Sequence, residues 1–271
     1  MLRIVRSRWM WTTALTAGIA IGLLAMTSAQ RFYRFGYAPA EANARYDGRF
    51  TFARLKYTGS AYNTYYKGLP SWAHGYARTD SGVPAEHQMM QILDAISAVH
   101  PRLDATNVFA LDDPDLCEFP VSYMTEAGFW VLGDEEARAF GAYLKKGGFV
   151  IFDDFRDPPR GGGGWATFEA NMHRVLPGLD IVDLDPSDPI FHTFFDIDSF
   201  DIIPQFYDTE RPTIRGIFED NDRSKRLMAV INFNTDISNF WEYSSSGLTP
   251  VDESNEAFEL GVDYIIYGLT H

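Results

Sequence analysis

The stretch that decides the fold is LKKGGFVIFDD, which occupies Leu144–Asp154. Its two lysines followed by two glycines are typical of a helix C-terminus, because cations complement the helix dipole and glycine readily takes the left-handed conformation that ends a helix. Asp134 begins the same helix and is followed by two glutamates. Phe149–Phe152 is continuously apolar, which is typical of a parallel strand buried on both faces. The stretch therefore predicts a helix leading into a central parallel strand.

The same alternation of short β-prone runs and helical stripes extends in both directions along the chain. We expect further strands at residues 49–57, 108–111, 120–124 and 181–182, and helices near 86–99, 134–146, 165–175 and 258–269. Two β-rich runs, 213–219 and 226–234, surround a turn-prone Asp-Asn-Asp and predict a hairpin. The pattern indicates one α/β domain, a three-layer sandwich with a central, mostly parallel sheet.

Composition limits the classes of protein to consider. The chain has 271 residues, a formal net charge of −14, 46% hydrophobic residues and one cysteine. Such a chain can bury a sizeable core, and its acidic balance argues against a nucleic-acid partner, whose phosphates require a basic surface. A single cysteine excludes an internal disulfide framework and any zinc site built on two or more cysteines.

The first 29 residues form a separate segment. Arg3, Arg6 and Arg8 precede an apolar run over residues 9–26, and Thr27-Ser28-Ala29 supplies small residues near a cleavage point. This pattern predicts an export signal; a retained membrane anchor and a buried helix are the alternatives. We expect an exported chain, periplasmic or anchored at the inner membrane through this segment alone, with a linker over residues 30–48 and the α/β domain over 49–271.

Two acidic pairs are the leading candidates for a site. Asp112-Asp113 and Asp153-Asp154 each follow a predicted strand, at the edge where open α/β sheets bind ligands. Such carboxylates can hold a divalent cation or act as a base, and the alternative is that they cap helices or close turns. Because side chains alternate along a strand, we expect Asp153 to be structural and Asp154 to face the crevice.

Other candidates are weaker. His192 can approach the sheet edge, and Trp72 lies in a tyrosine-rich loop, Thr58–Ala85, that is suited to stacking on a sugar or to covering the sheet. Gly161–Gly164 precede a helix and can cradle an anion, although a flexible loop is the simpler interpretation. Cys117 has acidic neighbours, which raise a thiol pKa, so it is a poor nucleophile.

Several short motifs together resemble the DUF4159 family of exported bacterial proteins over residues 49–271. They are Arg54-Leu-Lys-Tyr57, Trp72, Phe119-Pro120, Tyr123-Met124, Leu144–Phe149 leading into Asp153-Asp154, Arg174–Pro177, Asp188–Phe191 and Gly261-Val262. The resemblance implies a flavodoxin-like sandwich similar to the class I glutamine amidotransferases. It implies no reaction, and the cysteine elbow that amidotransferases need is absent after Phe149–Phe152. A histidine often precedes the Pro-Ile-Phe motif in the family, where Asp188 stands in this chain.

The sequence contains no complete catalytic constellation. We therefore expect a non-catalytic envelope domain that binds a protein or small ligand at the sheet edge, with no cofactor required and a divalent cation as an option. The alternative is a metal-assisted hydrolase that uses Asp153, Asp154 and His192. Carbohydrate recognition through Trp72 and the neighbouring tyrosines is a third hypothesis.

Overall fold

A computed structural model describes residues 42–59, 70–76, 84–158, 163–200 and 210–271. Seven strands form the main sheet in the order β3-β1-β4-β6-β9-β8-β7. Their bounds are β1 (Ala53–Lys56), β3 (Asn107–Ala110), β4 (Val121–Thr125), β6 (Phe149–Phe155), β7 (Val182–Asp183), β8 (Thr213–Phe218) and β9 (Leu227–Phe233). A second, two-stranded sheet pairs β2 (Thr58–Gly59) with β5 (Trp130–Val131) in antiparallel fashion.

The first five strands of the main sheet are parallel. β1 lies between β3 and β4, and the sheet continues through β6 to β9. In chain order this is the 2-1-3-4-5 arrangement of flavodoxin-like sheets, whose strand order reverses beside β1. β8 and β7 then extend the sheet as antiparallel strands. The carboxyl ends of β1, β4, β6 and β9 consequently meet at one edge.

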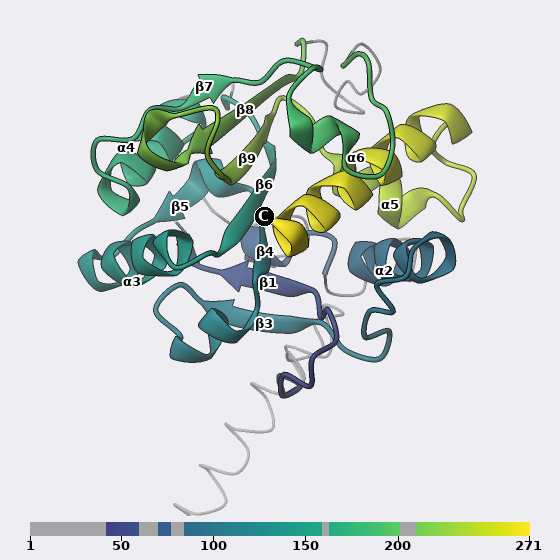
Figure 1. Cartoon of the computed structure of the whole chain (residues 1–271), viewed down its shortest axis with the longest axis horizontal. Coiled ribbons are helices and arrows are strands. Elements are labelled where there is room, and N and C mark those ends of the chain that lie inside the picture. Colours follow the sequence, from purple (N-terminus) through teal and green to yellow (C-terminus); the bar gives the residue numbers. More distant parts are fainter. Residues whose placement is uncertain (1–41, 60–69, 77–83, 159–162, 201–209) are drawn as a thin grey trace, which may run out of the picture. The chain divides into compact units, whose positions relative to one another are not determined.

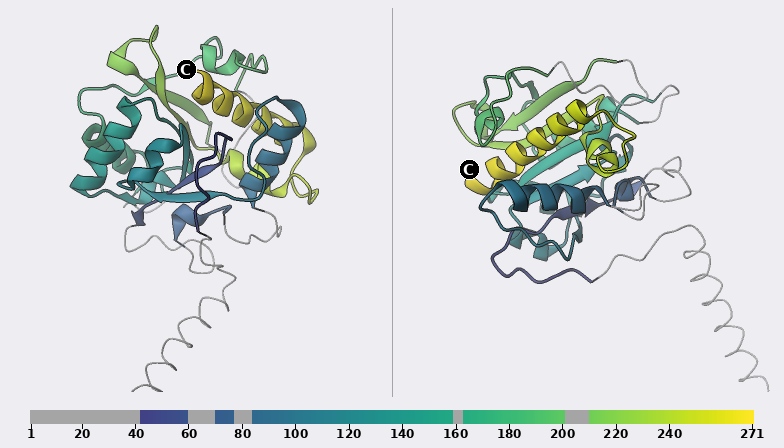
Figure 2. Two further views of the ribbon diagram at one scale, coloured as in Figure 1. Left: turned by 60° about the horizontal axis from the view of Figure 1, so that its bottom comes forward. Right: turned by 90° about the vertical axis from the view of Figure 1, so that its right-hand side faces the viewer.

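Helices cover both faces of this sheet (Figure 1, Figure 2). On one side α3 (Asp134–Lys145) packs on α4 (Trp165–Val175). On the other, α5 (Ile237–Tyr243) contacts both α2 (Ala85–Ile96) and α6 (Val251–Thr270). This arrangement confirms the predicted α/β class and the three-layer sandwich.

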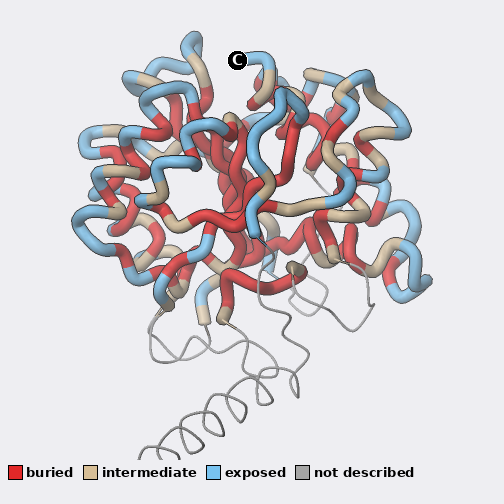
Figure 3. Tube along the Cα trace, turned by 90° about the horizontal axis from the view of Figure 1, so that it is seen from below, coloured by how far each residue is buried: buried red, intermediate tan, exposed pale blue. Residues whose placement is uncertain are grey.

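The central strands β6 and β9 are buried along their whole length. Figure 3 shows buried residues in the interior of the described chain and exposed residues around them. Alternate residues of β6 serve the two faces. Phe149 and Ile151 join the core under α2, α5 and α6, whereas Phe152 packs against Phe140 of α3 and Phe168 of α4. The continuous apolar run is therefore required by helices on both faces.

Most predicted elements are present, with several differences. The hairpin over 213–234 exists, but its second strand also pairs in parallel with β6 and so belongs to the centre of the sheet. The short helix α5 was not expected, and α6 begins earlier than the periodicity indicated, at Val251. The predicted loop Thr58–Ala85 contains β2 and the 3-10 turn Ser71–Ala73.

The predicted leader over residues 1–29 and most of the linker lie outside the described residues. Among the helices that the structure does describe, none combines the length and the apolar character needed to cross a membrane.

Candidate functional site

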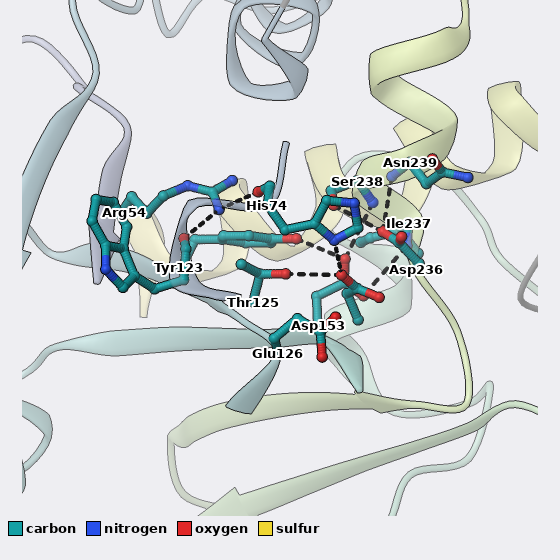
Figure 4. Close-up of polar contacts among 12 residues, drawn as sticks. Arg54, His74, Tyr123, Thr125, Glu126, Asp153, Asp236, Ile237, Ser238 and Asn239 are labelled. Atoms are coloured by element: carbon teal, nitrogen blue, oxygen red, sulfur yellow. Dashed lines mark hydrogen bonds and ion pairs between the residues drawn. The ribbon is translucent and has the colours of Figure 1, made fainter. Parts of the chain in front are cut away.

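Four acidic side chains gather where the parallel strands end (Figure 4). Glu126 follows β4, Asp153 and Asp154 lie near the end of β6, and Asp236 follows β9 by three residues. His74 joins them from the segment between β2 and α2. These five residues form what we call the edge cluster.

A local irregularity in β6 separates the two adjacent aspartates. Asp154 has a φ of 56°, in the left-handed region, and the pairing of β6 with β9 shifts register between Phe152 and Phe155. The Asp154 amide donates to the Thr235 carbonyl at 3.2 Å. Bulges of this kind re-aim side chains at the ends of strands. As a result, Asp153 and Asp154 meet different partners.

Asp153 connects the sheet to α5. Its Oδ1 accepts hydrogen bonds from the Asn232 amide at 3.2 Å and the Ile237 backbone N–H at 3.4 Å. Its Oδ2 accepts from the Tyr123 hydroxyl at 2.7 Å and the Ser238 backbone N–H at 3.2 Å. The two backbone donors, Ile237 and Ser238, belong to the first turn of α5, whose amides have no partner within the helix. Asp153 thus positions that helix on the sheet.

Asp154 faces the histidine. One carboxylate oxygen, Oδ2, contacts Nδ1 of His74 and accepts a hydrogen bond from the Thr125 hydroxyl at 3.1 Å. A ring nitrogen of His74 and one carboxylate oxygen each from Asp154 and Glu126 all lie within 4.8 Å of one another. His74 and Asp154 are buried, and Glu126 is half-buried. An imidazole and two carboxylates at this spacing are a donor set that suits a divalent metal ion.

A buried arginine holds the segment that carries His74. Nη1 of Arg54, on β1, donates to the carbonyl oxygens of Trp72 at 3.0 Å and of His74 at 2.6 Å. Nε of Arg54 pairs with Glu86 of α2, and both side chains are fully buried. The guanidinium also lies 5.1 Å from the centre of the Tyr123 ring. These contacts position His74 at the sheet edge, and none of them involves a carboxylate of the edge cluster.

Asp236 has one occupied and one open oxygen. Its Oδ1 caps α5 by accepting from the Asn239 backbone N–H at 2.9 Å, and it also accepts from the Ser238 hydroxyl at 2.8 Å. Its Oδ2 is buried and has no hydrogen-bond partner among the residues that the structure describes. A buried, unpartnered carboxylate oxygen is costly, so a group that binds it is favoured.

The edge cluster holds more acidic groups than it can ionise together. Burial, followed by repulsion from Asp236, raises the pKa of Asp153 to about 7, and burial followed by repulsion from Asp154 raises that of Asp236 to about 7. Burial and the charge of Asp154 likewise raise the pKa of Glu126 well above its usual value. Burial alone lowers the pKa of His74, but the carboxylates, Asp154 above all, outweigh it and raise that pKa to about 10. The surroundings therefore favour positive charge, which protonated His74 itself supplies in part, and a metal ion that bound Nδ1 would have to displace this proton.

The structure brings together only two of the residues that the sequence indicated, Asp153 and Asp154. Asp112 and Asp113 follow β3, the outermost parallel strand, and the side chain of Asp113 caps a 3-10 turn by accepting from the Asp115 amide at 3.1 Å. His192 is exposed on another 3-10 turn, η5 (Pro189–His192), where its ring contacts Asp196 at 3.1 Å.

The remaining candidates have structural surroundings. Trp72 is buried beside the edge cluster, and its carbonyl oxygen contributes to the hold on His74. The Asp157 carboxylate accepts a hydrogen bond from the Trp165 backbone N–H at 2.8 Å. It therefore occupies the N-terminus of α4, where the glycine run was considered as a cradle for a bound anion. Residues 161 and 162 of the glycine run lie outside the described residues. Cys117 is exposed and lies on the 3-10 turn Pro114–Glu118.

Sequence reasoning missed His74, Glu126 and Asp236. A usable signal existed for the two acids, since each follows a strand that turns out to be parallel. The strand before Asp236 was assigned only to a hairpin, which hid its carboxyl end. His74 lies between segments without a recognisable pattern, and its place depends on the long-range contact with Arg54.

Comparison with known families gives one match. A family model described as "Domain of unknown function (DUF4159)" matches residues 51–269. The chain belongs to the DUF4159 family. The match includes every residue of the edge cluster, so the cluster lies inside the DUF4159 domain. No curated protein matches the sequence.

Proposed function

We propose that this chain is an exported binding domain that holds one divalent cation at the carboxyl edge of its sheet. His74, Asp154 and Glu126 would be the ligands. The observation that carries the proposal is the convergence of their donor atoms within 4.8 Å. The leader pattern supports export, and a fold like that of the class I glutamine amidotransferases remains the expectation that the family resemblance supplies.

The donor set bears on the choice of metal. One imidazole nitrogen with carboxylate oxygens suits Mn²⁺, Fe²⁺ or Zn²⁺ better than Mg²⁺ or Ca²⁺, which prefer oxygen ligands alone. The open Oδ2 of Asp236 offers a further oxygen in the same neighbourhood. A cation of charge +2 would also relieve the repulsion among the carboxylates.

Burial favours binding over turnover. The side chains of His74 and Asp154 are only 8% and 2% exposed, whereas a catalytic metal keeps a coordination position open to water and substrate. Closed sites of this kind mainly stabilise the fold. Metal binding is then linked to folding, because an ion that binds the folded chain alone stabilises it by about 2.7 kcal/mol at a concentration one hundred times its dissociation constant.

The test is metal analysis of the full-length chain. Purified protein is stripped with a chelator, dialysed against Mn²⁺ or Zn²⁺, and analysed by mass spectrometry of the elements. We expect one ion per chain, an increase in melting temperature with metal, and loss of both in His74→Gln and Asp154→Ala. Asp113→Ala, which removes an acid from the end of the outermost parallel strand, is the matched control and should retain the ion.

Two outcomes would contradict the proposal. The first is wild-type protein that retains no ion and shows no thermal shift with any of Mn²⁺, Fe²⁺ and Zn²⁺. The second is a ligand variant that is folded by circular dichroism and still retains one ion per chain.

Metal-assisted hydrolysis is the second candidate, favoured by the open oxygen of Asp236. A carboxylate beside a bound ion can accept a proton from water. This differs from the sequence-based version, because Asp153 is engaged with α5 and His192 lies on a separate 3-10 turn. The metal-loaded chain would then hydrolyse p-nitrophenyl esters, and Asp236→Asn would abolish turnover while retaining the ion. A rate equal to that of the metal in buffer would rule this candidate out.

A further inference from the structure

A buried tyrosine, Tyr57, follows β1 directly and lies beside the edge cluster. Its hydroxyl oxygen is 3.0 Å from the carbonyl oxygen of Thr125 and 2.7 Å from that of Glu126. Carbonyl oxygens only accept, so the hydroxyl donates, and its single hydrogen is shared between the two. Tyr57 therefore contacts the main chain of a proposed metal ligand on both sides of the Glu126 α-carbon.

The backbone of Glu126 is left-handed, with a φ of 55°. Residues other than glycine rarely adopt this conformation, and it persists only where the surroundings hold it. In a regular strand successive carbonyl groups point in opposite directions, so one hydroxyl does not reach both. The carbonyls of Thr125 and Glu126 converge on one hydroxyl because the chain turns at Glu126. The hydrogen bonds of Tyr57 are thus specific to the left-handed form.

Other hydrogen bonds hold each peptide group beside Glu126 separately. The Glu126 N–H, in the peptide before the α-carbon, donates to the Asp153 carbonyl at 3.1 Å. The carbonyl in the peptide after it accepts from the Phe129 N–H at 3.1 Å. Tyr57 contacts both peptides, so its hydroxyl fixes how one is rotated relative to the other.

Strand pairing places Tyr57 at this point of the fold. Arg54 of β1 pairs with Tyr123 of β4, and the same register, if it continued, would set Tyr57 opposite Glu126. Shortly after these two residues the two chain segments pair again, as β2 with β5. Because pairing before and after fixes the backbone, the hydroxyl meets Glu126 as a preorganised donor.

The same hydrogen bonds reach a second proposed ligand through Thr125. The carbonyl of this residue accepts from Tyr57, and its hydroxyl donates to Oδ2 of Asp154 at 3.1 Å. That oxygen is the one that contacts His74. Holding the main chain of Thr125 therefore also helps to orient Asp154.

We propose that Tyr57 is a positioning residue of the metal site, because its hydroxyl holds Glu126 in the conformation in which the carboxylate reaches His74 and Asp154. The proposal rests on the metal site of the proposed function. Outer hydrogen-bond partners of metal ligands typically contribute tenfold to one hundredfold to metal affinity. Loss of the Tyr57 hydroxyl should therefore weaken metal binding and not only the fold.

A matched control lies at the other end of β4. The hydroxyl of Tyr143 donates to the carbonyls of Phe119 at 2.9 Å and Pro120 at 3.1 Å, the two residues before that strand. Tyr143 is also buried, so Tyr143→Phe removes the same kind of hydrogen bonds as Tyr57→Phe. A purely structural effect should appear equally in both variants.

The test is a metal titration of the full-length chain. The probe is the free ion, Mn²⁺, Fe²⁺ or Zn²⁺, that the stripped wild-type protein binds most tightly by calorimetry. Sucrose in the buffer favours the folded state of every variant, and circular dichroism checks it. We expect Tyr57→Phe to bind the ion at least tenfold more weakly, a change of about 1.4 kcal/mol, and Tyr143→Phe to bind within about twofold of wild type.

A double-variant cycle tests whether Tyr57 acts through Glu126. Glu126→Gln keeps an oxygen donor but removes the charge, so it should bind the ion weakly. Adding Tyr57→Phe to it should weaken binding by about threefold or less, the share that passes through Thr125 to Asp154.

The outcomes separate this inference from the metal site itself. Wild-type protein that binds none of the three ions refutes the site, and the inference with it. Where wild type binds an ion, the inference alone is overturned if Tyr57→Phe binds as tightly as wild type. It is also overturned if Tyr143→Phe weakens binding equally, or if the full effect of Tyr57→Phe persists in Glu126→Gln.

Discussion

Replacing Asp236 by asparagine separates the two roles of this side chain. One oxygen caps α5 through the Asn239 amide at 2.9 Å, and the other is buried without a hydrogen-bond partner among the described residues. Asparagine is as good an N-cap as aspartate. The substitution therefore keeps the cap and removes a negative charge from the edge cluster.

The expected magnitude follows from the pKa of Asp236. Burial and the neighbouring Asp154 raise it from 3.8 to about 7, partly offset by His74. Because the folded-state pKa lies above the unfolded value, the folded chain holds the proton more tightly, and stability falls as the pH rises from about 4 to about 7. At about 1.4 kcal/mol for each tenfold change in acid strength, the ionised group destabilises the fold by roughly 4 kcal/mol at pH 8.

Coupling within the cluster reduces this figure, because the pKa of Asp153 is also raised to about 7 and the two groups do not ionise independently. We expect Asp236→Asn to stabilise the metal-free chain by about 2–4 kcal/mol at pH 8 and by less than half of that at pH 5. Each kcal/mol corresponds to a shift in melting temperature of about 2–4 °C for a domain of this size. The measurement is urea unfolding in the presence of a chelator at both pH values.

Asp236→Ala is the matched comparison. It removes the same charge but also the cap, so it should be less stable than Asp236→Asn by about 1 kcal/mol at both pH values. The reasoning is refuted if Asp236→Asn is less stable than wild type at pH 8, or if its effect is the same at pH 5 and pH 8.

Three further predictions concern stability and can be measured by urea unfolding. A Cβ added at Gly141 of α3 would lie 2.3 Å from the carbonyl oxygen of Val175, so Gly141→Ala should destabilise by about 1–3 kcal/mol despite its better helix propensity; a more stable variant would contradict this. Glu86→Gln leaves the buried Arg54 charge unpaired and should lower the free energy of unfolding by about 3–5 kcal/mol. Adding Arg54→Met should restore most of this loss. A double variant no more stable than Glu86→Gln alone would argue against this reasoning. Burial, opposed by backbone amide donors, raises the pKa of Asp263 to about 6, so the contribution of Asp263 to stability declines from pH 4 to pH 6. Asp263→Asn should therefore flatten that part of the curve of unfolding free energy against pH. An unchanged slope would disprove this prediction.

The sequence predicts the sheet well because its central strands are marked by local runs of apolar residues. Phe149–Phe152 is apolar on both faces, and the structure places it between helices on both faces. The helix before it begins and ends where its charges and glycines indicate. The short helix α5 escaped prediction because its seven residues are stabilised from outside, by the Asp153 carboxylate bonded to its first amides.

The site was harder to predict because it depends on strand order. Asp112-Asp113 and Asp153-Asp154 have the same local pattern, but β3 is the outermost parallel strand and β6 is central. Only knowledge of the order 3-1-4-6-9 distinguishes an acid at the margin from one that meets acids on two neighbouring strands. Glu126 and Asp236 are the acids on those neighbouring strands. Once β4 and β9 are known to flank β6, both acids are predicted as site residues, because open α/β sheets bind ligands at the carboxyl ends of their parallel strands.

The adjacent pair in β6 shows how one strand end can serve both scaffold and site. In a regular strand Asp153 and Asp154 would point to opposite faces, one toward α5 and the other into the layer of α3 and α4. The left-handed backbone at Asp154 breaks this alternation and brings its carboxylate to His74 instead. Asp153 meanwhile holds the first turn of α5, directly after Asp236. The residue that positions the helix and the residue that faces the histidine are therefore neighbours in the chain, so a substitution at either one tests a different part of the same edge cluster.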